Sequence, residues 1–174
     1  MVLPLGGYST ATLLNAPKHI PLDLTLHTPC GASIALSKAP GESVQHLLLK
    51  GLLWSLLLPT HPGAACEVDL GLRFKPDVVA IDGSTGDPCW WGECGSVKSS
   101  KLCILARTYP QARFSVAKWG RSDLRGYANQ LVSTHEHKST LAHALTKDKN
   151  STHLHYLTLA AALGAQVATT HGTI

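Results

Sequence analysis

Charged residues are scarce in this chain of 174 residues: they make up 15% of it, against about 25% in an average soluble domain. This scarcity, with 44% hydrophobic residues, excludes a disordered chain, whose signature is high charge with little apolar content. It also excludes a coiled coil, which needs charged residues along its flanks. Length and apolar content instead suit a globular domain of ordinary size.

Long hydrophobic runs are also missing. A membrane-spanning helix needs about 20 apolar residues, and the nearest candidate, 47–58, is shorter and contains Lys50 and Gly51. No basic segment precedes an apolar run at the N-terminus, so neither a membrane protein nor a secretory signal is predicted. The five cysteines form no C-x-x-C pair, which argues against a paired-cysteine zinc site. We therefore expect a reduced, cytoplasmic protein.

Basic residues are concentrated in the second part of the chain. Residues 1–97 hold five Lys/Arg and eight Asp/Glu, whereas residues 98–174 hold ten and three, so the net charge of +4 comes from the second part. A basic section suits a polyanionic partner such as nucleic acid, DNA or RNA, because each cation that neutralises a phosphate adds affinity. A solvated surface would give the same pattern, and charge alone leaves both readings open.

Apolar periodicity and turn residues predict the elements. Strands are expected over 8–14, 22–27, 32–37, 66–74, 77–81, 88–94 and 113–119. Helices are expected over 42–57, 99–108, 123–132 and 151–163. The helix over 42–57 is apolar on nearly every side, so it must be covered on nearly every side.

The order of these elements indicates the architecture. The turn at Asp82-Gly83 predicts an antiparallel hairpin, and the strand–helix–strand crossover over 90–119 predicts parallel pairing. The expected fold is therefore α/β (α+β), a mixed β-sheet flanked by helices. We expect a single domain over 1–135, including the N-terminal strands, and a helical extension and tail over 136–174.

Three carboxylates carry the expected chemistry. Asp77 opens one strand and Glu93 ends the next, so a hairpin can bring them side by side, while Glu42 opens the apolar helix. Two carboxylates aimed at one point repel each other unless a cation neutralises them. Oxygen ligands of this kind suit Mg²⁺ or Mn²⁺, which can activate water at a phosphate.

Short motifs in this order resemble the YaeQ-like family of the PD-(D/E)XK nuclease superfamily. The resemblance runs from about residue 24 to 132. The stretches that carry it are Ile34-Ala35-Leu36 with Pro40-Gly41-Glu42, Lys75-Pro76-Asp77, Glu93-Cys94-Gly95, and Ala112-Arg113-Phe114-Ser115-Val116-Ala117-Lys118-Trp119-Gly120-Arg121-Ser122. The resemblance implies a restriction-endonuclease-like fold and a Mg²⁺- or Mn²⁺-dependent phosphodiesterase acting on nucleic acid.

The resemblance also assigns roles to the acids. Asp77 and Glu93 match the two metal-binding acids, with the Cys94 carbonyl beside them, and Glu42 matches an acid on the first helix. Gly95 stands where an active nuclease usually has lysine. The YaeQ family also has glycine there, followed by glutamine, whereas this chain has Ser96.

Other lysines are near enough to replace the missing one. We expect Lys98 to act as the catalytic lysine, with its amine closer to the acid pair than that of Lys101. Lys101, Lys118 and Arg121 are then the expected nucleic-acid contacts.

Plainer interpretations of the same residues remain open. Asp77 can cap a turn, Glu93 can form a salt bridge with Lys98, and Glu42 can complement a helix dipole. For the whole chain, the alternative to a nuclease is a catalytically degenerate module on the same fold that binds nucleic acid or protein. A protein unrelated to nucleic acid is the third reading.

Overall fold

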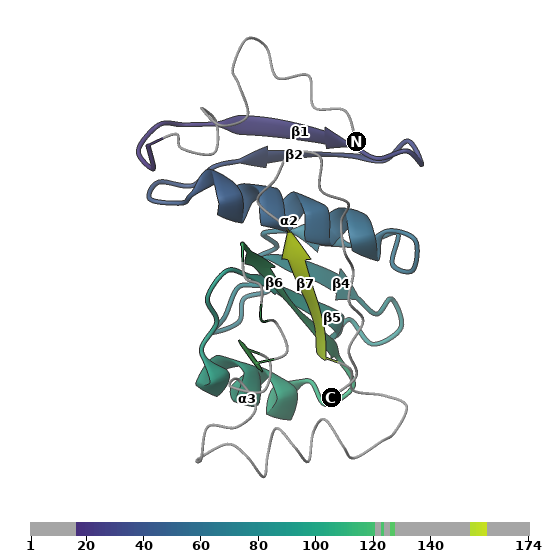
Figure 1. Cartoon of the computed structure of the whole chain (residues 1–174). Coiled ribbons are helices and arrows are strands. Elements are labelled where there is room, and N and C mark those ends of the chain that lie inside the picture. The colour runs from purple at the N-terminus through teal and green to yellow at the C-terminus, as the bar shows by residue number, and fades with distance from the viewer. Residues whose placement is uncertain (1–16, 121–122, 124–125, 128–153, 160–174) are drawn as a thin grey trace.

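The computed structural model describes residues 17–120, 123, 126–127 and 154–159, which form a layered α+β fold (Figure 1). This confirms the predicted fold class. The elements are β1 (Asp23–His27), β2 (Ser33–Ser37), α2 (Val44–Leu57), β3 (Ala65–Cys66), β4 (Val78–Ile81), β5 (Pro88–Cys94), α3 (Ser99–Thr108), β6 (Arg113–Trp119) and β7 (Leu154–Leu159).

A five-stranded sheet in the order β3-β4-β5-β6-β7 is the centre of the molecule. The β3, β4 and β5 strands are antiparallel, whereas β5, β6 and β7 are parallel. The parallel pair β5–β6 is connected through α3, as a crossover requires. The predicted hairpin and crossover are therefore both confirmed.

Helix α2 lies between this sheet and the β1–β2 hairpin (Figure 1). Leu47 packs against the hairpin, while Leu53, Trp54 and Leu57 pack against the five-stranded sheet. A Cβ on Gly51 would lie 1.9 Å from Leu26 Cδ1, so only glycine allows the hairpin to come this close. Coverage on both sides explains why the helix is apolar nearly all round.

Helix α3 covers the opposite face of the sheet. Trp91 of β5 is fully buried and packs with Leu102 and Leu105 of α3, whereas its neighbour Trp90 belongs to the α2 side. Successive residues of a strand point to opposite faces, so these two tryptophans assign one face to each helix. Both are core residues.

Two predicted elements are wrong. The strand expected over 66–74 is paired only at Ala65–Cys66, because Glu67 follows with a φ of 57° and turns the chain away. The helix expected over 151–163 contains strand β7, which pairs with β6. The expected strand 8–14 lies outside the described residues, as does most of the helix expected over 123–132, of which 126–127 are helical.

Candidate functional site

The two acids singled out from the sequence lie at the adjacent ends of β4 and β5. The antiparallel register of β4 and β5 places Asp77, the residue before β4, opposite Glu93. The carboxylate of Asp77 contacts α2: its Oδ1 lies 3.2 Å from His46 Nε2. Its Oδ2 accepts a hydrogen bond of 2.6 Å from the backbone N–H of Cys94. Both oxygens of Asp77 therefore already face donors of the chain.

Glu93 is held on the other side of the sheet, toward α3. Its Oε2 lies 2.6 Å from Lys101 Nζ, and its Oε1 accepts a hydrogen bond of 2.6 Å from Trp91 Nε1. Burial raises the pKa of Glu93, and the charge of Asp77 adds to the rise, while Lys101 and Trp91 oppose it. Asp77 and Glu93 thus each contact a basic side chain from a different helix.

Glu42 belongs to a third set of charges at the start of α2. Its Oε1 lies 2.6 Å from the ammonium of Lys50, whose side chain is only 2% exposed. The same ammonium lies 2.7 Å from Glu67, which also pairs with Lys75 at 2.8 Å. Burial alone would lower the pKa of Lys50, but its two carboxylates raise it on balance. This network holds α2 against the β3 end of the sheet.

His46 contacts two of the acids, and it was not predicted as a site residue from the sequence. Its Nε2 lies 3.6 Å from Glu42 Oε1 as well as 3.2 Å from Asp77 Oδ1. The hydrogen bond to Asp77 raises the pKa of His46, against the lowering effect of burial. The available signal was its spacing of four residues from Glu42 on a predicted helix, a distance at which side chains meet.

The backbone of Gly95 disfavours any side chain at this position, including lysine. Its φ is 78°, a conformation that side chains other than glycine rarely adopt. A Cβ there would also lie 3.3 Å from Nδ1 of His46. The imidazole of His46 therefore lies beside the backbone from which a side chain at position 95 would project.

The prediction that the Lys98 amine lies closer to the acid pair than that of Lys101 is wrong. Lys101 contacts Glu93 at 2.6 Å, whereas Lys98 forms no ion pair with a described carboxylate. Lys98 is the N-cap residue of α3, with extended backbone and an exposed side chain. Lys101 is in the first turn, where side chains point back toward the helix N-terminus and here toward the end of β5.

A pocket of about 370 Å³ opens beside this ion pair, and its wall includes Arg73, Lys98, Lys101 and Glu93. Lys101 and Glu93 neutralise each other, so Arg73 and Lys98 give the wall its net positive charge. Neither of these two cations is within ion-pair distance of a carboxylate in the described part of the chain.

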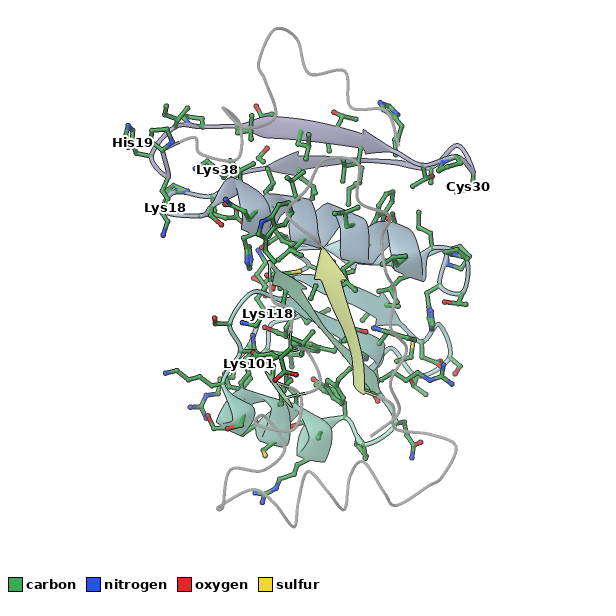
Figure 2. The ribbon with its side chains drawn as sticks, viewed as in Figure 1. Lys18, His19, Cys30, Lys38, Lys101 and Lys118 are labelled. Atoms are coloured by element: carbon green, nitrogen blue, oxygen red, sulfur yellow. The ribbon has the colours of Figure 1, made fainter. Side chains whose placement is uncertain are left out.

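Lys118 of β6 adds a further cation next to the pocket. Its ammonium donates a hydrogen bond of 3.1 Å to Ser96, a wall residue, and lies 4.4 Å from the centre of the Tyr127 ring. Figure 2 shows Lys118 and Lys101 on the same side of the molecule, between α2 and α3. Arg121 lies outside the described residues. Arg73 was not predicted, and nothing in the sequence beyond its nearness to Lys75-Pro76-Asp77 marks it.

The acids as arranged do not form a ready site for Mg²⁺ or Mn²⁺. In the described ranges, no three His, Cys, Asp or Glu side chains make a group that could hold a metal ion. Glu42, Asp77 and Glu93 contact Lys50, His46 and Lys101 respectively, so each acid has a basic partner from the chain. An ion would have to displace these partners.

The thiols near the acids are unsuited to nucleophilic chemistry. Burial raises the pKa of Cys66 to about 12 and that of Cys94 well above its ordinary value. The thiolate is the nucleophile, and these sites disfavour it.

Comparison with known proteins gives structural likenesses only. No protein-family model matches the chain, and no curated protein matches it. The chain is similar to the YaeQ protein from Pseudomonas syringae, at 14% identity and a TM-score of 0.47 over 75% of this chain and 74% of that one. It is also similar to the YaeQ protein from Xanthomonas axonopodis pv. citri, at 16% identity and a TM-score of 0.42 over 83% of this chain and 84% of that one.

Among the described residues, none of the helices has the length and apolar character needed to cross a membrane.

Proposed function

We propose that this protein binds nucleic acid through the phosphates of one strand, at the pocket beside α3, without a metal ion. The observation that carries the proposal is the charge of the pocket wall. Arg73 and Lys98 face the pocket uncompensated, while its acid, Glu93, is neutralised by Lys101. Such a wall attracts phosphate, because binding releases the counterions condensed on the nucleic acid.

Lys118, which donates a hydrogen bond to Ser96 of the pocket wall, extends this positive region along one side of the molecule (Figure 2). Phosphate contacts from lysine and arginine position a nucleic acid without reading its sequence. We therefore expect binding that depends strongly on salt and weakly on sequence.

All five cysteines are free thiols, which supports the reducing, cytoplasmic setting predicted from the sequence.

The proposal is tested by fluorescence anisotropy with a labelled oligonucleotide of random sequence at low salt. The Arg73→Ala/Lys98→Ala variant should bind roughly tenfold more weakly than the wild type, because two phosphate-facing cations are lost. Lys18→Ala/Arg113→Ala removes the same charge from exposed positions outside the pocket and is the matched control. Equal losses in both variants, or no binding by the wild type, would contradict the proposal.

A metal-dependent phosphodiesterase is the second candidate. The contact between Glu93 and Lys101 favours it, because it brings an acid and a lysine together at the end of β5, next to the strand that Asp77 precedes. The resemblance implies that Asp77, Glu93, Glu42 and the Cys94 carbonyl hold the ion. A bound ion raises the unfolding temperature by mass action, so thermal unfolding with millimolar Mg²⁺ or Mn²⁺ separates the candidates. The binding module predicts no shift and no cleavage, whereas the enzyme predicts both.

A further inference from the structure

The pocket beside α3 has an apolar wall as well as a cationic one. Phe74, Ile104 and Val97 line it together with the cations. The side chain of Ile104 is 38% exposed, and Phe74 is partly buried against the core cluster that holds Trp91. A pocket of a few hundred Å³ with both kinds of wall suits a small part of a ligand that is itself part apolar and part charged.

Phe74 is positioned as an aromatic platform. The guanidinium carbon of Arg73 lies 5.3 Å from the centre of its ring, and the ammonium of Lys101 lies 5.5 Å from it. Both cations lie over the ring, so a base that stacks on Phe74 takes the place of the exposed Arg73 side chain, which stays close enough to contact the phosphate. In proteins that bind single-stranded nucleic acid, bases stack on aromatic side chains while cations follow the backbone.

We infer that the pocket selects single-stranded over double-stranded nucleic acid by taking one unpaired base against Phe74. The inference rests on the proposed function and adds the class of nucleic acid to it. A single strand offers an exposed base and its phosphate together, and so can use both walls. A duplex keeps its bases paired and stacked, so only its phosphates can contact Arg73 and Lys98.

The experiment compares three labelled probes of equal length at one salt concentration: a single strand, its duplex, and a strand whose sugars carry no bases. The wild type should bind the single strand about tenfold more tightly than either of the others, an effect within the range of one stacked base. This comparison needs no variant, so it does not depend on whether a changed protein folds.

Two substitutions then test the platform itself. Phe74→Leu should reduce the preference for the base-bearing strand to about twofold or less, whereas Phe74→Tyr should keep it, because tyrosine retains the aromatic face. Equal binding of the single strand, the duplex and the base-free strand would overturn the inference while leaving phosphate binding intact. If no probe is bound, the proposed function itself fails.

Discussion

At the scale of single residues, the site is defined by which cation reaches which acid. Lys101 contacts Glu93 and His46 contacts Asp77, and neither contact follows from sequence spacing alone. Lys98, three residues before Lys101, stays exposed at the helix cap. The difference arises because Lys98 is the N-cap residue, with extended backbone, whereas Lys101 lies within the first helical turn.

The ion pair between Lys101 and Glu93 predicts unequal effects of two lysine substitutions. Lys101→Met should lower the free energy of unfolding by about 1–3 kcal/mol, because it leaves a buried carboxylate without its charged partner. Lys98→Met should change it by no more than about 0.5 kcal/mol. Urea denaturation of both variants measures the difference. If Lys101→Met leaves the free energy of unfolding unchanged, the ion pair does not form in solution.

Gly95 gives a second prediction at this scale. Gly95→Ala should cost about 1–2 kcal/mol, because a side chain is strained at its positive φ and would meet His46. Gly63→Ala is the control, since nothing lies near its position and its backbone is not left-handed. Chemical denaturation should show the loss in the first variant alone. A stable Gly95→Lys would argue against the strained geometry.

At the scale of elements, α2 depends on its apolar contacts with both neighbouring layers. Trp54 is 4% exposed, and its Nε1 donates a hydrogen bond of 2.8 Å to the carbonyl of Ala64. Trp54→Ala should therefore cost about 3–5 kcal/mol, the range for a large core aromatic. Leu56→Ala, on the same helix at 43% exposure, should cost far less. A loss below about 1 kcal/mol for Trp54→Ala would mean that the helix is peripheral.

The turn between β4 and β5 predicts a pH dependence. The Asp82 carboxylate accepts hydrogen bonds from the Ser84 side chain and from the backbone N–H groups of Ser84 and Thr85, which lower its pKa. A lowered pKa stabilises the fold above the ordinary aspartate range, and the effect is lost as pH falls through the folded-state value.

Asp82→Asn keeps an acceptor oxygen in the turn but cannot titrate. The difference in unfolding free energy between wild type and Asp82→Asn should be full near pH 7 and shrink below about pH 4. Thermal or urea unfolding across this pH range measures it. If the difference does not depend on pH, ionisation of the Asp82 carboxylate does not stabilise the turn.

At the scale of the whole molecule, the layers place the cations of separate elements around one pocket. Arg73 comes from the segment before β4 and Lys98 from the cap of α3, while Lys118 lies next to the wall from β6. If about three cations neutralise phosphates, the logarithm of the binding constant should fall with the logarithm of salt at a slope of about −2.

Removing one of these cations should change that slope by a known amount. Lys98→Ala should make it shallower by about 0.7 for a single strand, whereas Lys18→Ala, outside the pocket and beside the β1–β2 hairpin, should leave it unchanged. Anisotropy titrations at several salt concentrations give both slopes. An identical slope for Lys98→Ala and wild type would exclude this lysine from the phosphate contacts.

Much of the architecture could be predicted because its signals are local. Period-2 alternation identified β1 and β2, and the Asp82-Gly83 turn identified the β4–β5 hairpin. The apolar run of α2 identified a helix that must be covered on both sides. These features depend on neighbours along the chain, so the sequence alone determined them, together with the placement of Asp77 and Glu93 on adjacent strands.

Pairing between distant segments was decided by the tertiary structure. Residues 154–159 mix apolar and polar side chains in a pattern that suits a helix or a strand, and their pairing with β6 makes them a strand. In the same way, Lys101, His46 and Lys50 each contact a carboxylate that packing brings to them. Charge pairing acts over a few ångströms in space, and apart from the i,i+4 spacing of Glu42 and His46 these partners are well separated along the chain. The partners of the acids, and the pocket beside them, were therefore decided by the folded molecule.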